Sequence, residues 1–329
     1  MNSPFIRCSL RASSPLTQDK TPYRDSPMKT PIVAWIDGSF ADSEQATVPI
    51  LSHSFSRASA IFEVLSIIDA DSGPAMLCLE EHVDRFFSSA QRTYLTIPYS
   101  RETIRDALIQ TARKNSVTNG LAKFYAYYTD LELGNHAPHQ VSVAIFCLDY
   151  TAIGVNQRDF WKPVSVGISQ YRKLHPQTAA VHAKVVGNYV NGYLARTEVR
   201  RKGFEEALML DTNGFIAEGP TSNIFLVKGS HVETPTEENV LPGITRMLIM
   251  EVLADMGYPV KEAHILPQDL CQYDEAFFSG TLKAVQPITV IEGCEFTSPG
   301  AVTAALKKKI QELATGTIPR YQRFLTYLA

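Results

Sequence analysis

The alternation of apolar and polar residues divides the first half of the chain into strands and helices that begin near residue 33. A β-hairpin is expected over Val33–Asp42 (VAWIDGSFAD), and helices are expected around Ser56–Glu63 and over Leu79–Thr93. Another helix (RETIRDALIQTARKN) follows Ser100, whose hydroxyl group suits an N-cap. The pattern therefore predicts that helices and strands are mixed in this half.

Two β-rich runs complete the first half, LAKFYAYY at residues 121–128 and VSVAIFCL at residues 141–148. A Gly/Asn/Pro loop is predicted between them at Gly134–Pro138, and residues 151–161 are expected to connect two domains. We therefore expect a small α+β domain over residues 31–150.

The second half, residues 162–329, is predicted to alternate strands with helices. A strand over Ala207–Leu210, a turn (DTNG) and a second strand from Phe215 indicate a hairpin. A helical run (ITRMLIMEVLADMG) stops at Gly257, and a last helix begins after Ser298 and Pro299. The predicted fold class is α+β, with a larger C-terminal domain after the small one.

Residues 1–30 differ from the rest of the chain, because they are rich in Ser, Pro, Arg and Thr and show little apolar periodicity. We expect a disordered leader there. Arg7 and Arg11, with several serines and no acid before Asp19, are weakly typical of an organelle transit peptide. An extended reading frame ahead of Met28 explains the segment better, since the folded pattern starts only at VAWIDGSF.

The composition limits the classes of partner. The chain of 329 residues is 45% hydrophobic and 20% charged, which suffices for two cores, and its net charge of -3 predicts binding to neither nucleic acid nor an anionic membrane. No apolar run approaches the ~20 residues that span a bilayer. Five widely spaced cysteines without a CxxC pair indicate reduced thiols and a cytoplasmic protein, and no metal site is implied. No Walker loop or GxGxxG motif is present, which argues against nucleotide-driven chemistry.

One lysine stands out as candidate chemistry. Lys184 is flanked by Ala183, Val185 and Val186 in HAKVVGNY, and burial among apolar groups lowers a lysine pKa from its usual value of about 10.4. A neutral lysine amine is the usual nucleophile that forms a Schiff base with pyridoxal phosphate or a carbonyl substrate. The alternative is a surface lysine whose stem lies along apolar neighbours.

Two further residues strengthen the first reading. Tyr189 lies five residues on in an expected helix start (GNYVNGYLAR), so its phenol is near the same face as Lys184. Glu218 precedes Gly219-Pro220, which places its carboxylate at a strand end rather than buried within a sheet. Pyridoxal phosphate needs an acidic partner for its ring nitrogen, although a solvated turn acid is the other reading of Glu218.

These segments resemble the class IV aminotransferases, the family of the branched-chain and D-amino-acid aminotransferases and aminodeoxychorismate lyase. The resemblance is carried by HAKVVGNYVNGYLARTEVRRKGFEEALMLDTNGFIAEGPTSNIFLV, VLPGITR and DEAFFSGTLKAVQP, in this order, and it extends from about residue 34 to about residue 318. It implies the two-domain fold type IV architecture, with pyridoxal 5′-phosphate between the domains.

The resemblance also implies the cofactor residues. Lys184 is the Schiff-base lysine, Tyr189 the partner of the ring hydroxyl group, and Glu218 the partner of the pyridine nitrogen. The phosphate group is bound by Arg85 and by a cup that takes in Gly243, Ile244, Thr245 and Thr281, while Leu241 packs on the ring. The sequence supports this cup independently, because Pro242-Gly243 opens a helix whose free amides and dipole suit a phosphate dianion.

The substrate end departs from the family pattern. Arg57 stands where branched-chain enzymes have a tyrosine, Val64 where they have a glycine, and Lys123 where an arginine helps to bind the substrate carboxylate. Arg57 could take over that task, since arginine binds carboxylates bidentately. Further substrate candidates, which the sequence does not rank, are Arg172, His182, Thr281 and Leu282. The FEV segment resembles D-amino-acid enzymes and the LPGITR half resembles branched-chain enzymes, so the handedness of the substrate stays open.

The expected function is a pyridoxal-phosphate-dependent aminotransferase that passes the amino group of a branched-chain-type or D-amino acid to 2-oxoglutarate by a ping-pong mechanism. The resemblance implies a homodimer in which Arg57 or Lys123 reaches the partner's site. Three alternatives remain: a lyase of the aminodeoxychorismate type, a non-catalytic carrier of vitamin B6, and a purely structural two-domain protein.

Overall fold

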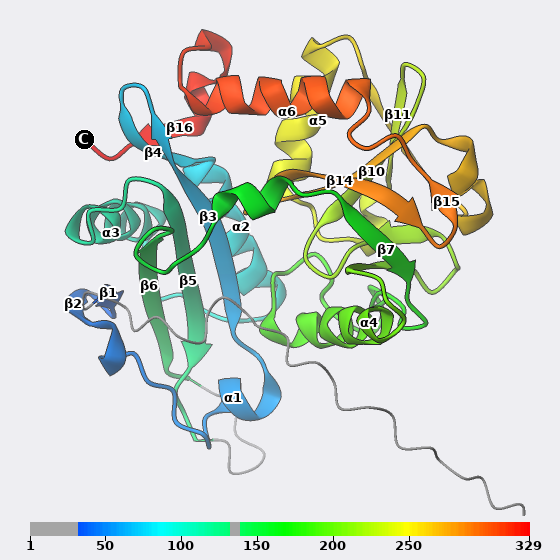
Figure 1. The fold of residues 1–329 in the computed structure, drawn as a ribbon. Helices are drawn as coiled ribbons and strands as arrows, with labels where there is room; N and C mark the ends of the chain where they lie inside the picture. Colours follow the sequence, from blue (N-terminus) through cyan, green and yellow to red (C-terminus); the bar gives the residue numbers. More distant parts are fainter. Residues whose placement is uncertain (1–31, 132–138) are drawn as a thin grey trace, which may run out of the picture.

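The computed structural model describes residues 32–131 and 139–329, so the predicted leader and the predicted loop Gly134–Pro138 lie outside the described residues. Within these ranges the strands form one seven-stranded and one nine-stranded sheet. Figure 1 shows the two sheets side by side.

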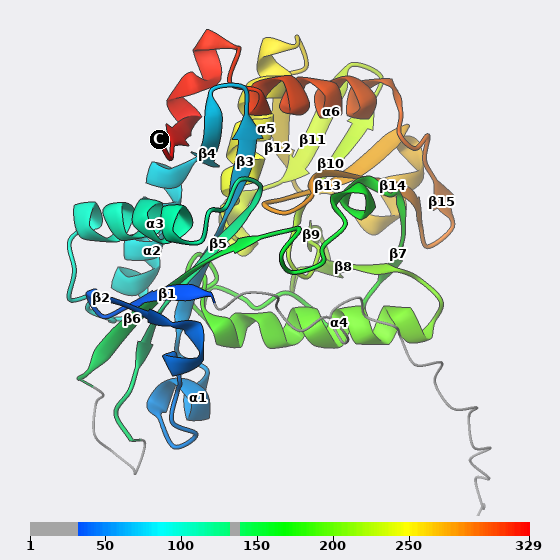
Figure 2. The ribbon, with the colours of Figure 1, turned by 60° about the vertical axis from the view of Figure 1, so that its left-hand side comes forward.

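The first sheet is antiparallel and runs in the order β16-β4-β3-β5-β6-β1-β2. Helices α2 (Leu79–Arg92) and α3 (Arg101–Lys114) cover one face of it, as Figure 2 shows. Its strands are β1 (Val33–Ile36), β2 (Ser39–Asp42), β3 (Ile61–Ala70), β4 (Gly73–Leu77), β5 (Gly120–Tyr128), β6 (Val141–Asp149) and β16 (Leu325–Tyr327).

Most predictions for this half are confirmed, including the first hairpin, both long helices, the Ser100 N-cap and strands β5 and β6. The predicted helix Ser56–Glu63 is wrong. A short helix α1 (His53–Arg57) ends where Ala58 adopts a left-handed conformation (φ 52°), and strand β3 follows. Buried and half-buried residues alternate along most of β3, because successive side chains of a strand point to opposite faces of the sheet.

The second sheet follows the path β12-β11-β10-β13-β14-β7-β8-β9, and an additional pairing of β9 with β10 closes part of it into a ring. β15 pairs with the C-terminal end of β14. Its strands are β7 (Val164–Ile168), β8 (Glu206–Leu210), β9 (Ile216–Glu218), β10 (Asn223–Lys228), β11 (His231–Pro235), β12 (Val260–Ala263), β13 (Glu275–Gly280), β14 (Ala284–Ile291) and β15 (Cys294–Glu295).

Three helices flank the second sheet: α4 (Val190–Arg201) on one side, and α5 (Ile244–Asp255) and α6 (Ala301–Ala314) on the other (Figure 1). Strand-helix alternation holds for two parallel crossovers, β7-α4-β8 and β11-α5-β12. Five further pairs of consecutive strands are antiparallel neighbours: β8–β9, β9–β10, β10–β11, β13–β14 and β14–β15. Gly257 ends α5 with φ 85°, as the sequence predicts.

Two features of the C-terminal half were not predicted. The last strand, β16, returns to the first sheet and pairs with β4. Cys271 of η5 (Pro267–Gln272) and Cys294 of β15 form a disulfide. The prediction of five reduced thiols is therefore wrong for this pair. Cys78 and Cys147 are buried free thiols. Pairing of cysteines 23 residues apart depends on tertiary structure, which spacing does not reveal.

No helix in the described ranges combines the length and the apolar character that crossing a membrane requires.

Candidate active site

Lys184 lies in an irregular segment between the two sheets, and both of its backbone polar groups are bonded to the first sheet and its helix. Its carbonyl group accepts a hydrogen bond from Phe62 N at 3.0 Å, and its amide donates to Ser89 Oγ of α2 at 3.0 Å. Burial and then the positive charge of Arg85 lower the pKa of Lys184 to about 8. The amine is therefore nucleophilic much closer to neutral pH than that of an ordinary lysine.

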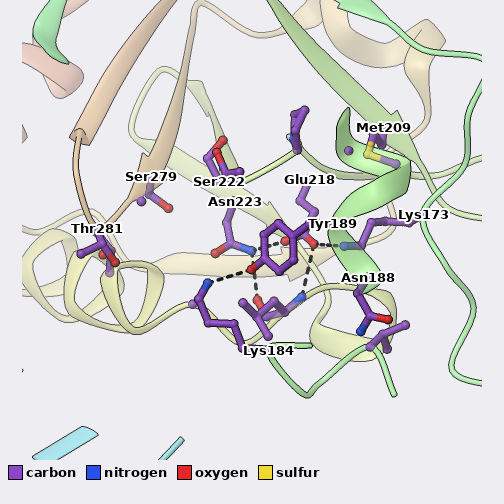
Figure 3. Close-up of a pocket in the computed structure, with 18 of the residues that line it drawn as sticks. Lys173, Lys184, Asn188, Tyr189, Met209, Glu218, Ser222, Asn223, Ser279 and Thr281 are labelled. Carbon is purple, nitrogen blue, oxygen red and sulfur yellow. Dashed lines mark hydrogen bonds and ion pairs between the residues drawn. The ribbon is translucent and has the colours of Figure 1, made fainter. Parts of the chain in front are cut away.

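Tyr189 is the direct partner of this amine. It ends the 3₁₀ turn η3 (Val186–Tyr189), which leads into α4, and its hydroxyl oxygen accepts a hydrogen bond from Lys184 Nζ at 2.7 Å (Figure 3). The phenol ring packs edge-on against Phe62, with centroids 5.0 Å apart. Burial raises the pKa of the Tyr189 phenol above its usual value, so the group is a neutral hydrogen-bonding partner.

Glu218 ends strand β9, as the sequence predicts, but it is only 5% exposed, because β9 lies between β8 and β10. Asn223 Nδ2 donates to Glu218 Oε2 at 2.9 Å, and Lys173 Nζ lies 2.5 Å from Glu218 Oε1. Burial lowers the pKa of Lys173, but the Glu218 carboxylate more than offsets this, and the net shift is upward. Glu218 is thus an anion fixed between an amide and a cation (Figure 3).

The start of α5 approaches the same cavity. Gly243 is its N-cap residue, and a Cβ atom there would lie 2.1 Å from Asn223 Oδ1, so only glycine allows this approach. Asn223 Nδ2 also donates to the Leu241 carbonyl oxygen at 3.2 Å. Ile244 and Thr245 line the cavity with the first turn of the helix, whose leading N–H groups have no partner within the helix.

Arg85 reaches the cavity from α2 and is held by a buried carboxylate. Its Nε and Nη2 donate to the two oxygens of Glu63 at 2.6 and 2.8 Å, and its Nη1 donates to the Pro242 carbonyl oxygen at 3.0 Å. His82 Nδ1 lies 2.8 Å from Glu63 Oε2. The guanidinium group is therefore fixed beside the start of α5.

The residues described so far surround one cavity of about 720 Å³, counted with its open mouth. Among the residues that the sequence nominates, the lining includes Arg85, Lys184, Tyr189, Glu218, Leu241, Gly243, Ile244, Thr245 and Thr281.

A second cavity of about 1520 Å³ adjoins the first and shares Lys184, Tyr189 and Thr281 with it. It is lined by Lys123 and Leu282, two of the nominated substrate residues. Lys123 Nζ lies 5.7 Å from the Phe62 ring centroid and 5.2 Å from that of Tyr125. We call the first space the cofactor cavity and the second the substrate cavity.

Three nominated residues lie elsewhere in the described chain. Arg57 and Arg172 are exposed and line neither cavity. The backbone carbonyl oxygen of Arg172 accepts a hydrogen bond from Asn191 Nδ2 at 3.0 Å. His182 Nε2 lies 2.8 Å from the Glu237 carbonyl oxygen, away from both linings. The chain by itself therefore brings Lys123, but not these three, to the substrate cavity.

Comparison with known proteins agrees with this geometry. Residues 60–291 match the family model described as Amino-transferase class IV. This chain is a class IV aminotransferase. The branched-chain-amino-acid aminotransferase of Pseudomonas aeruginosa is 31% identical to it over 297 residues, which cover 89% of this chain and 96% of that protein.

Solved structures of similar aminotransferases share the fold. That of the branched-chain aminotransferase of Thermoproteus uzoniensis with norvaline has a TM-score of 0.85 and 28% identity, covering 91% of this chain and 100% of that one. A second branched-chain amino acid aminotransferase, the T.th. enzyme solved with N-(5′-phosphopyridoxyl)-L-glutamate, gives the same TM-score of 0.85 and 28% identity, over 91% and 99% of the two chains. The architecture is therefore the α+β fold of these enzymes.

The residues of this aminotransferase fit pyridoxal phosphate chemically. The cofactor cavity combines a lysine amine of lowered pKa, a phenol in contact with it and a buried carboxylate. It also combines a guanidinium group with a helix N-terminus, a pair that suits a phosphate dianion. The chain thus offers a group for the aldehyde, for the ring nitrogen and for the phosphate.

Sequence reasoning missed Lys173, Asn223 and Glu63, which hold the residues that it found. Asn223 carried a weak signal, since it stands five residues after Glu218 across a tight Gly-Pro turn. Glu63 was misplaced on a helix, although ten residues with a β-branched pattern favour a strand. Lys173 carried no signal, because its pairing depends on the packing of the segment after β7 against β9.

Proposed function

We propose that this pyridoxal-phosphate-dependent aminotransferase exchanges an amino group between branched-chain L-amino acids and 2-oxoglutarate by a ping-pong mechanism. The carrying observation is the position of the Lys184 amine, which lines both cavities and bonds to Tyr189 at 2.7 Å. A group there can reach a cofactor in one cavity and a substrate in the other.

When bound, pyridoxal phosphate joins an amine through its aldehyde and withdraws electrons from the bond between Cα and its hydrogen. Glu218, anchored by Asn223 and Lys173, holds a proton on the ring nitrogen. Arg85 and the first turn of α5 bind the phosphate group. With the cofactor bound, Lys184 Nζ would be the group that accepts and carries the proton that leaves the substrate Cα.

The walls of the substrate cavity support an apolar side chain as one substrate. Phe62 and Val64 of β3 lie beside Lys123 and Tyr125 of β5, their cross-strand partners in the sheet. Val186, Phe278 and Leu282 add apolar surface. The names of the relatives, branched-chain aminotransferases, point to the same class of substrate, and the glutamate adduct of the T.th. enzyme points to 2-oxoglutarate as the acceptor.

We further propose that Lys123 binds the α-carboxylate group and that a second copy of the chain completes the site. The face of β5 and β6 opposite α2 and α3 carries a mainly apolar groove of about 1010 Å³, lined by Val48, Phe55, Tyr127 and Phe146 among others. Phe55 is 64% exposed and adjoins Arg57 on α1. A homodimer that covers this face would carry Arg57 toward the partner's substrate cavity.

A half-reaction panel tests the proposed function. The holoenzyme is mixed with single amino acids, L and D, and the absorbance change from the pyridoxal to the pyridoxamine form of the cofactor is followed. L-leucine, L-isoleucine, L-valine and L-glutamate should convert it, and 2-oxoglutarate should reverse the change. Conversion by D enantiomers alone would contradict the proposal. Repeated release of pyruvate from aminodeoxychorismate without an acceptor, with the cofactor left in its pyridoxal form, would indicate the lyase.

Sedimentation equilibrium tests the dimer, for which a mass of twice the 36.5 kDa chain is expected. Phe55→Glu, which places a charge in the apolar groove, should shift the mass toward one chain. A wild-type protein that sediments as a single chain and still turns over would disprove the shared site.

A further inference from the structure

Lys283 projects into the substrate cavity from the turn 281–283 that joins β13 to β14, the turn that also brings Thr281 to both cavities. Its Nζ donates a hydrogen bond to Gln286 Oε1 at 2.7 Å. Gln286 is 3% exposed, and its Nε2 donates in turn to the Lys162 carbonyl oxygen at 3.3 Å. The hydrogen bond to the Lys162 carbonyl group thus orients the Gln286 amide, and this amide holds the Lys283 ammonium group at the cavity wall.

The direct partner of the Lys283 ammonium group is an amide rather than a carboxylate. No carboxylate within residues 32–131 and 139–329 forms an ion pair with Lys283, whereas the neighbouring Arg196 is paired with Glu206 through Nη2 at 2.8 Å. Burial lowers the pKa of Lys283, and the positive charges of Arg196 and Arg200 lower it further against the attraction of Glu206. An ammonium group has three donors, so two remain for a ligand after Gln286.

Lys283 and Lys123 come from different sheets to the same cavity, Lys123 from β5 and Lys283 from the β13–β14 turn. Apolar side chains of β3, β13 and the turn line the space between them, among them Val64, Phe278 and Leu282. The cavity therefore offers two separate cations with an apolar wall. A substrate with an anion at each end matches this arrangement, and so does one with an apolar tail.

We propose that Lys283, oriented by Gln286, is the specificity residue that binds the distal anionic group of an acidic amino acid and of its 2-oxo acid. This inference rests on the proposed function, since it concerns the second substrate of the same site. The apolar wall receives the branched side chain of the first substrate, and Lys283 receives the side-chain carboxylate of the other. One cavity then serves both halves of the exchange without rearrangement of the backbone.

The test measures ligand selectivity in the holoenzyme. Glutarate carries two carboxylates and 4-methylpentanoate carries one with an apolar tail, and neither has an amino group that could react. Isothermal titration should show that Lys283→Met raises the Kd of glutarate about ten- to a hundredfold, the loss expected for one charge-assisted hydrogen bond. The ratio of kcat/KM for L-glutamate to that for L-leucine should fall by a similar factor.

Two further variants give the comparison its controls. Lys308→Met, which removes a 79% exposed lysine of α6, should leave the ratio of the two Kd values as in the wild type. Lys283→Arg keeps the charge and should restore most of the glutarate selectivity. If Lys283→Met unfolds, as thermal denaturation would reveal, Lys283→Gln supplies the neutral variant.

The inference is overturned if Lys283→Met raises the Kd values of glutarate and 4-methylpentanoate by the same factor. It is also overturned if the Kd of glutarate stays within about threefold of the wild-type value, because the loss of one charge-assisted hydrogen bond should raise it more. It is also overturned if Lys123→Met, and not the Lys283 variant, removes glutarate selectively, because the distal anion then binds at Lys123. Failure of the proposed function gives a different result. The cofactor of the wild-type holoenzyme would then not be converted to the pyridoxamine form by any of the amino acids, whether or not the variants bind glutarate.

Discussion

The cofactor cavity and the substrate cavity share Lys184, but their charged groups are satisfied in different ways. In the cofactor cavity Arg85 is paired with Glu63, and Glu218 with Lys173 and Asn223. In the substrate cavity Arg196 is paired with Glu206, but Lys123 lies over aromatic rings and Lys283 against an amide. Within the described residues neither lysine is paired with a carboxylate. The cofactor cavity is preorganised by the chain itself, whereas the substrate cavity leaves cations for the ligand's own carboxylates.

This difference suits the two kinds of ligand. A cofactor that stays bound needs fixed partners, and orientation of those partners in advance removes the cost of ordering them on binding. Two substrates that alternate in one cavity need groups that tolerate both. A cation without a protein carboxylate as its partner can bind the carboxylate of the acidic substrate, and an apolar wall accepts the side chain of the branched-chain substrate at little cost.

Lys184→Ala should have the largest effect, because it removes the proposed covalent attachment and the proposed proton carrier from the boundary of the two cavities. We expect the rate of the half-reaction with L-leucine to fall by at least about 10⁴-fold, the upper range for general acid–base catalysis. Stopped-flow absorbance checks this. Borohydride reduction of the wild type followed by peptide mapping should place the cofactor on Lys184, and a label on another lysine would refute the assignment.

Glu63→Gln tests the preorganised cavity. Burial raises the pKa of Glu63, but Arg85 and His82 outweigh it, so the pKa lies well below its ordinary value. Removal of one partner of a buried pair typically costs about 3–5 kcal/mol, measured as the free energy of unfolding in urea. The stabilisation should be present above the unfolded pKa of about 4.3 and be lost as the pH falls below it.

Asp84→Asn is the matched control for Glu63→Gln. It also turns a carboxylate of the first half into an amide, but its partner Arg101 is exposed, as is Asp84 itself. Such surface pairs contribute about 0–1 kcal/mol. Equal losses of stability for the two variants would mean that the Glu63–Arg85 pair has no special role.

Arg57→Ala tests whether the substrate cavity is completed by another subunit. If Arg57 binds a substrate carboxylate across the dimer, KM should rise about ten- to a hundredfold for amino acids and oxo acids alike, as expected for one charge-assisted hydrogen bond. Steady-state kinetics with L-leucine and 2-oxoglutarate measures this. An unaltered KM would leave Arg57 as an ordinary surface residue, in line with its exposure in the single chain.

The smallest of the expected effects is the pH dependence of the rate at which the cofactor attaches to Lys184. Only the neutral amine attacks the cofactor aldehyde, and the ammonium form does not. Because the pKa of Lys184 is about 8, the neutral amine becomes the main form only above that pH. The rate at which the apoenzyme binds pyridoxal phosphate should rise about tenfold per pH unit below about 8 and level off above it. An inflection near the ordinary lysine value of about 10.4 would show that the cavity does not perturb this amine.

The candidate site shows how far each kind of sequence signal reaches. Lys184 and Tyr189 are five residues apart, so the local pattern of apolar neighbours and a helix start already pointed to their contact. The Ser100 N-cap and the long helices of the first half were found because capping and periodicity are local properties. Glu63 was misplaced because the predicted helix Ser56–Glu63 was extended past the left-handed turn at Ala58 into the start of β3, whose β-branched residues favour a strand.

The sequence by itself determined most of the elements and pointed to Lys184 as the proposed nucleophile, because periodicity, caps and turns act between near neighbours in the chain. Only the tertiary structure decided what holds those side chains. Arg85 meets a carbonyl group 157 residues away, and the Lys184 amide donates to a serine 95 residues before it. Such contacts exist only once the sheets have packed, and it is their burial that removes water and turns an ordinary lysine into a nucleophile.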